Sequence, residues 1–246
     1  MSKILITSGC SFSETKLQTG SWPAHLYEKL KNHNFTEFKN YAMGSQGNGL
    51  ISRSIIYGVL HALKTYQPQD ILVGVMWSAS GRMDYRIKDY DLLSFTDNID
   101  GWVENPTGFV EGAKKHWMIL NQSWKCKEAR LYYEYFYDYI GAAIYSFEHI
   151  LRTQQLLKLK NINYFFTNFI NENILYDKDL THPEIEYLYK EIDQTNYLPV
   201  DSEQNWLCKT NAPRHCDDQL IHPSKEEHKL FVDSVIYPYL TGKNII

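Results

Sequence analysis

The feature that most constrains the fold is a nearly continuous apolar run at Asp70–Met76, which reads DILVGVM and follows a turn containing Pro68. A strand that is apolar on both sides is expected in a parallel sheet covered by helices on both faces. A second short apolar run, Lys3–Thr7, stops at Ser8 and Gly9 and is typical of another buried strand. The chain is therefore expected to fold around a sheet of buried strands.

Segments with helical spacing separate the strand candidates. Pro23 fits the first turn of a helix near 22–32, and Ser224 followed by Glu227 forms a capping box that opens a helix over 224–240. Further helices are expected over Leu50 to about Tyr66, Ala129 to about Lys160 and Pro183–Lys190, and further strands over Phe35–Ala42 and 161–168. This alternation predicts an open α/β sheet with helices on both faces.

The stretch 77–125 carries little periodicity and many polar residues, so it is expected to form an insertion or lid. The remainder of 169–215, outside the short helix, is expected to be irregular. Hydrophobic residues make up 43% and charged residues 22%, which is ordinary for a folded protein. Because no repeat and no Ser/Gly/Pro-rich linker divides the chain, one domain over 1–246 with a mid-chain insertion is predicted.

Composition argues against several classes of protein. Twenty-five Lys and Arg stand against 29 Asp and Glu, a net charge of −4, and no basic stripe points to nucleic acid. The N-terminal apolar run is too short for a signal peptide, and no run of about 18 apolar residues suggests a membrane span. A reducing cytoplasm, of a cell or of an infected host, is expected. The four cysteines are too few for a disulfide scaffold: Cys10, Cys126, Cys208 and Cys216.

Three loops are placed where an open α/β sheet binds ligands, beyond the carboxyl ends of its strands or at the start of a helix. They carry a serine, glycines that lead into a helix, and an acid–histidine pair: Ser8–Ser13, Gly44–Gly49 and Asp217–Pro223. A serine hydroxyl needs a base within hydrogen-bond reach, and a carboxylate on the far side of the imidazole fixes its tautomer. Backbone N–H groups and an amide would hold the oxyanion. Together these groups predict acyl transfer.

At these residues the sequence resembles the SGNH, or GDSL-like, hydrolase family. Gly9-Cys10-Ser11-Phe12-Ser13 is similar to its first block, Asn40–Gly44 to its second, and His222-Pro223 to its last. The resemblance implies a flavodoxin-like three-layer sandwich with a central parallel sheet, Ser11 as nucleophile with its backbone N–H as an oxyanion donor, and His222 as base. The Gly-Cys-Ser-Phe variant, with Trp77-Ser78 after the third strand, is similar to a subgroup seen in phage and marine microbial proteins.

The chain departs from the family pattern at two functional positions. The third block, Gly-x-Asn-Asp, is replaced by Trp77–Arg82, which contains no asparagine. Asn48 is therefore predicted to supply the oxyanion amide, with Gly44, Ser78 and Arg82 as further oxyanion or substrate-binding residues. The acid should stand three residues before the histidine, where Gln219 lies. Asp218 is favoured and Asp217 is the alternative; if neither reaches, a Ser–His dyad would remain.

Other interpretations use the same residues. Gly44, Gly47 and Gly49 would serve equally as turn residues with positive φ. A zinc site would draw on Cys208, His215, Cys216, His222 and His228, but the irregular spacing disfavours it, and no metal or cofactor is expected. The tyrosine-rich Leu131–Ile140 favours half-buried packing over a sugar-stacking surface.

The sequence thus predicts a serine esterase that hydrolyses an O-acyl ester, and an aromatic-lined insertion would suit an O-acetyl group on a glycan. Two alternatives stay open. One is a glycan O-acyltransferase, and the other is a catalytically degenerate module that binds glycans or builds a particle such as a phage. The expected partner is a small-molecule or glycan ester, with no nucleic acid and no membrane.

Overall fold

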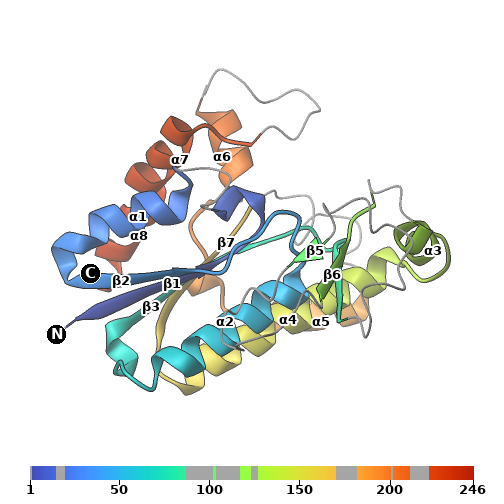
Figure 1. The fold of residues 1–246 in the computed structure, drawn as a ribbon, viewed down its shortest axis with the longest axis horizontal. Helices are drawn as coiled ribbons and strands as arrows, with labels where there is room; N and C mark the ends of the chain where they lie inside the picture. Colours follow the sequence, from blue (N-terminus) through green and yellow to red (C-terminus); the bar gives the residue numbers. More distant parts are fainter. Residues whose placement is uncertain are drawn as a thin grey trace.

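A four-stranded parallel sheet forms the centre of the molecule (Figure 1). The computed structural model describes residues 2–14, 20–86, 102–103, 117–122, 127–169, 182–200, 202–210 and 222–246. The strand order is β2-β1-β3-β7, with every neighbouring pair parallel. This is the flavodoxin-like order that was predicted. The strands are β1 Lys3–Ser8, β2 Phe35–Asn40, β3 Ile71–Trp77 and β7 Asn163–Asn168.

Helices cover both faces of the sheet, as Figure 1 shows. On one face lie α1 (Trp22–Leu30), α6 (Glu203–Lys209), α7 (Lys225–Phe231) and α8 (Tyr237–Gly242), with a π-helical turn at Val232–Ile236 before α8. On the other face lie α2 (Asn48–Ala62), α4 (Tyr139–Leu159) and α5 (Pro183–Glu191). Short 3-10 turns stand at Ser11–Ser13 (η1), Lys31–His33, Pro68–Asp70 and Gln194–Asn196.

Strand β3 shows why the sheet is covered on both sides. Ile71, Val73 and Val75 pack into the core under α2 and α4, whereas Leu72 and Met76 pack into the core under α1 and α7. All seven residues of the strand are buried. Alternate residues of this apolar run therefore pack into the two cores on opposite faces of the sheet, as expected for a central parallel strand.

The segment from Ala129 to Lys160 differs from its prediction. It forms two helices, α3 (Lys127–Tyr135) and α4, because Asp138 adopts an extended conformation and its carboxylate accepts the N–H of Gly141 at 2.7 Å. An N-cap of this kind starts a new helix. The expectation of irregular chain over 169–215 is also wrong at α6, where Ser202 is the N-cap and accepts the N–H of Asn205.

The stretch predicted as an insertion or lid contains a second, antiparallel sheet. Its strands, in spatial order, are β4 (Met83–Arg86), β6 (Trp117–Leu120) and β5 (Trp102–Val103). Leu50 of α2 packs against Ile119 of β6, which ties this sheet to the main domain. The rest of 77–125 beyond residue 86 lies outside the described residues, apart from residues 102–103 and 117–122.

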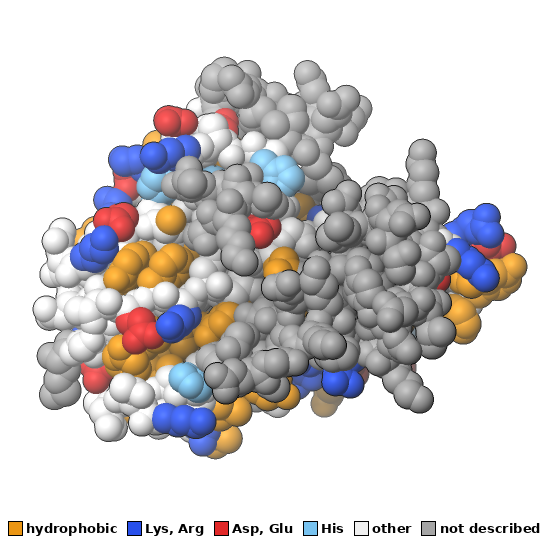
Figure 2. All heavy atoms as spheres, viewed as in Figure 1, with side chains coloured by type: hydrophobic (Ala, Val, Ile, Leu, Met, Phe, Trp, Pro, Cys, Tyr) orange, Lys and Arg blue, Asp and Glu red, His pale blue; other side chains and the backbone are white. Residues whose placement is uncertain are grey.

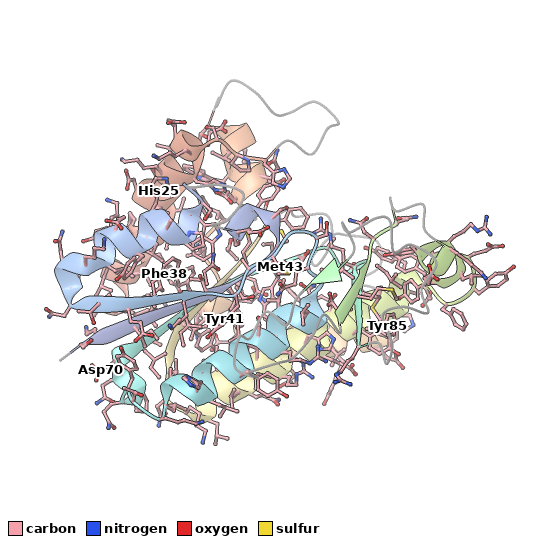
Figure 3. All side chains as sticks on the ribbon, in the orientation of Figure 1. His25, Phe38, Tyr41, Met43, Asp70 and Tyr85 are labelled. Atoms are coloured by element: carbon pink, nitrogen blue, oxygen red, sulfur yellow. The ribbon has the colours of Figure 1, made fainter. Side chains whose placement is uncertain are left out.

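The surface carries mixed charge and small apolar areas. On the face in Figure 2, basic and acidic side chains of the described residues lie side by side near α1 and α7. Phe38 of β2 stacks on Tyr27 of α1 with ring centroids 5.1 Å apart, and Figure 3 places Phe38 between that helix and the strand. Among the described helices, none is long and apolar enough to cross a membrane.

Candidate active site

Ser11 and His222 meet at the carboxyl edge of the sheet, although 211 residues separate them in sequence. Ser11 begins η1, directly after β1, and His222 stands three residues before α7. The Oγ of Ser11 lies 2.6 Å from the Nε2 of His222. The two predicted reacting groups are therefore within hydrogen-bond reach, which is the first geometric requirement for serine activation.

The loop that carries Ser11 is fixed by its neighbours. A side chain at Gly9 would clash with Ser13, whose hydroxyl accepts the indole N–H of Trp22 at 2.8 Å. Phe12 is buried; its ring centroid lies 5.2 Å from that of Phe169 and 5.0 Å from that of the His222 imidazole. This aromatic contact holds the imidazole beside the serine.

His222 is suited to act as a base. The pKa of His222 is lowered by partial burial, by the nearby His228 and by the positive charge of Arg82. At neutral pH the ring is therefore uncharged, and a neutral imidazole with its proton on Nδ1 can accept the serine proton at Nε2. The predicted acids, Asp217 and Asp218, lie outside the described residues.

The loop after β2 lies beside the end of β1 and the residue that follows it. The N–H of Tyr41 donates to Thr7 and that of Met43 donates to Gly9, so the loops after β1 and β2 run together. Figure 3 places Met43 at this edge of the sheet. The N–H of Gly44, a predicted oxyanion donor, donates to the Oε2 of Glu14 at 2.8 Å. A carboxylate of the chain thus accepts the hydrogen bond that an oxyanion would need.

Asn48 performs a different task from the predicted one. Its Nδ2 donates to the carbonyl of Ser78 at 3.0 Å and to the hydroxyl of Ser146 at 3.1 Å, and its Oδ1 accepts the N–H of Ser78 at 2.7 Å. Both amide hydrogens are used inside the protein. The prediction that Asn48 donates to an oxyanion is therefore not supported by these contacts; it fastens α2 to the end of β3.

Ser78 and Arg82 occupy the region of the missing asparagine. Nη1 of Arg82 donates to the Oγ of Ser78 at 2.8 Å, and the guanidinium lies 5.1 Å above the ring of Phe169. Because Ser78 Oγ already accepts a hydrogen bond from the cation, its own O–H is available as a donor. Burial is the main cause of the lowered pKa of His222, and the charges of His228 and then Arg82 add to it.

Three tyrosines of Leu131–Ile140, Tyr132, Tyr133 and Tyr137, pack against one another, whereas Tyr135 and Tyr139 are exposed. The hydroxyl of Tyr133 lies 2.6 Å from the carbonyl oxygen of Gly81 and 2.9 Å from that of Leu120. Tyr132 meets Tyr85 edge to face. Burial raises the pKa of Tyr132 and of Tyr133. Half-buried packing, the favoured interpretation, is confirmed for this pair.

His228, one of the residues considered above as zinc ligands, contacts a buried glutamate. It is fully buried, and its Nδ1 lies 2.6 Å from the Oε1 of Glu203, which is also fully buried. This pair joins α7 to α6, the helices on either side of residues 211–221. Within the described parts of the chain, no group of three His, Cys, Asp or Glu residues could hold a metal ion. His215 and Cys216 lie outside those parts.

Sequence reasoning missed several polar residues: Glu14, Arg53, Asp84, His149 and Glu203. Glu14 contacts the loop after β2, follows the first block by one residue and could have been noticed there. Arg53, Asp84 and His149 lie on α2, β4 and α4, and only the packing of those elements brings them to one cavity. Glu203 lies on α6 and pairs with His228.

The comparisons with known proteins support the fold. No family model and no curated protein matches the sequence. Among solved structures, the crystal structure of TesA matches with a TM-score of 0.50 and 12% identity, over 99% of this chain and 100% of that one. At this identity the likeness concerns the fold alone. The chain therefore has an α/β fold similar to that of TesA, with a central four-stranded parallel sheet flanked by helices.

Proposed function

We propose that the protein is a serine esterase that hydrolyses an O-acyl ester. The observation that carries the proposal is the 2.6 Å contact between Ser11 Oγ and His222 Nε2. It joins a loop after β1 to the segment before α7, and the neutral imidazole has the protonation state that a general base needs.

In the first half of the reaction, Ser11 Oγ attacks the ester carbonyl while His222 takes its proton. Collapse of the tetrahedral intermediate breaks the bond to the alcohol, which leaves with the proton from His222. In the second half, His222 takes a proton from water and the water oxygen attacks the acyl-enzyme. The bond between Ser11 Oγ and the acyl carbon then breaks, His222 returns its proton to Ser11 Oγ, and the carboxylic acid leaves. Asp218, chosen from the sequence, would hold the Nδ1 proton of His222.

The oxyanion needs donors where the tetrahedral intermediate forms. The backbone N–H of Ser11 and the O–H of Ser78 are our candidates, the latter because Arg82 already donates to Ser78 Oγ. The N–H of Gly44 would join them once the carboxylate of Glu14 moves away from it. Removing one such donor typically lowers the rate by about 10²–10³-fold.

For the substrate, an O-acetyl group on a glycan stays our preferred case. Tyr135 and Phe136, next to the insertion on and after α3, are 68% and 75% exposed. Exposed aromatic rings of this kind suit stacking against sugars. Acetate release from O-acetylated glycans, compared with release from a small aryl acetate, tests this choice.

The esterase is tested by intact-mass analysis after treatment with a fluorophosphonate probe. A single adduct is expected on the wild type and on Ser234→Ala, which changes an exposed serine in the π-helical turn Val232–Ile236, and none on Ser11→Ala or His222→Ala. Absence of an adduct on folded wild type would overturn the mechanism and favour a glycan-binding module.

A further inference from the structure

A separate cavity of about 130 Å³ lies between α2, α4 and the start of the insertion. It has room for a few water molecules or one small oxyanion. Neither Ser11 nor His222 lines it. The side chains that matter here are Arg53, Arg82, Asp84, Tyr145, Ser146 and His149.

The charge around this cavity is mainly positive. Arg53 of α2 and Arg82 line it, and the charge of Arg152, one turn beyond His149 on α4, reaches both Arg53 and His149. Among the described residues that line the cavity, the carboxylate is that of Asp84.

The carboxylate of Asp84 accepts two backbone hydrogen bonds in addition to balancing positive charge. Its Oδ1 accepts the N–H of Gly47 at 3.1 Å and its Oδ2 accepts the N–H of Leu50 at 3.0 Å. The carboxylate therefore caps the first turn of α2, where the helix dipole also favours negative charge. It offsets only part of the positive charge of the three arginines.

The cations are partly desolvated, and this has an electrostatic cost. Burial lowers the pKa of Arg53 and of Arg152. Burial, followed by the charges of Arg152 and Arg53, lowers the pKa of His149 to about 4. A bound anion would relieve the repulsion among these groups and accept hydrogen bonds from them.

Arg82 links this cavity to the reacting groups. It lines the cavity, donates to Ser78 and influences His222. We propose that the cavity binds an anionic group of the substrate, a carboxylate or a phosphate, so that the enzyme prefers esters of acidic molecules. The assignment of this anion to the substrate rests on the proposed function, whereas anion binding by Arg53 and His149 can be measured whether or not the protein is an esterase.

The first test measures binding alone. The imidazole signals of His149, assigned with the variant His149→Gln, are followed by NMR against pH with and without inorganic phosphate, in the inactive variant Ser11→Ala. Phosphate is expected to move the titration of His149 to higher pH. Arg53→Gln should weaken this effect about tenfold or more in phosphate concentration, since a charge-assisted hydrogen bond is lost, while Arg53→Lys keeps most of it. An unchanged titration in phosphate would overturn the proposal.

The second test measures selectivity in the active protein with two p-nitrophenyl esters, the succinate monoester and its neutral methyl ester. The ratio of kcat/KM for the anionic over the neutral ester should fall about tenfold in Arg53→Gln and stay constant in Arg130→Gln, an exposed arginine on α3. If the ratio in Arg53→Gln equals that of the wild type, the substrate assignment is overturned. If neither ester reacts but phosphate still shifts His149, the anion site stands and the esterase fails.

Discussion

The candidate catalytic edge of the sheet, at Ser11 and His222, and the α2–α4 cavity position their polar groups in opposite ways. At the edge, Ser11 and His222 lie on short segments after a strand and before a helix, and the ring of Phe12 packs against His222. In the cavity, Arg53 and His149 lie within long helices, and the carboxylate of Asp84 is buried on the first turn of α2. We therefore expect changes at the edge to affect rate with little effect on stability, and changes in the cavity to affect stability as well.

The largest expected effect is a loss of activity without a loss of stability, and it concerns Ser11 at the edge of the sheet. Ser11→Ala should lower kcat/KM for an aryl ester by about 10³-fold or more, because nucleophile and base act as a unit. The free energy of unfolding, measured by urea denaturation, should change little, since the hydrogen bond of Ser11 Oγ runs to the exposed His222 and not into the core. His222→Ala should give a similar loss, and a double variant should lose no more than either single one. Additive losses would contradict a shared mechanism.

Arg82 belongs to both regions and tests whether they are coupled. Arg82→Gln should lower kcat/KM about ten- to a hundredfold, because Ser78 loses its charged donor. The rate falls on the acid side as His222 becomes protonated, and Arg82 opposes that protonation. The acid limb of the pH–rate profile should therefore lie below the ordinary histidine pKa in the wild type and move to higher pH in Arg82→Gln. Arg82→Lys, which keeps the charge, should leave the limb in place; a shift there would point to geometry instead.

A substitution of Asp84 tests how the cavity contributes to the stability of the protein. Burial raises its pKa from 3.8 to about 6 in the folded protein. Between these values the folded state holds a proton that the unfolded state has lost, so this group's contribution to stability falls as pH rises. The expected loss is about 2 kcal/mol from pH 4 to pH 6. In Asp84→Asn, urea denaturation across this range should show a curve that is flatter by that amount. An unchanged slope would mean that Asp84 stays ionised when folded.

Glu14 gives the smallest effect and concerns the edge alone. Its carboxylate accepts the N–H of Gly44 and must leave before an oxyanion can use that donor. Glu14→Ala should therefore raise kcat/KM a few-fold without moving the midpoint of unfolding much. A fall in kcat/KM would show instead that Glu14 positions the loop after β2.

Much of the fold follows from local pattern. The apolar run of β3 predicts a strand buried on both faces, and the capping box at Ser224 and Glu227 is present as predicted at the start of α7. The break at Asp138 was not predicted, because helical spacing continues through it and the capping hydrogen bond depends on backbone geometry. Short strands of the insertion, such as β4, lack enough periodicity to be recognised.

The sequence by itself determined the type of fold, because its strands and helices have clear periodicity. It also pointed to Ser11 and His222, which stand in short blocks next to those elements and whose side chains lie 2.6 Å apart in the structure. Only the tertiary structure decided which polar groups share hydrogen bonds. The side-chain amide of Asn48, predicted to donate to the oxyanion, donates instead to the carbonyl of Ser78 and the hydroxyl of Ser146. The hydroxyl of Ser78 accepts a hydrogen bond from Arg82. The reason is physical: a strand or helix is set by neighbours along the chain, whereas the partner of a polar side chain is set by elements that meet only after they pack.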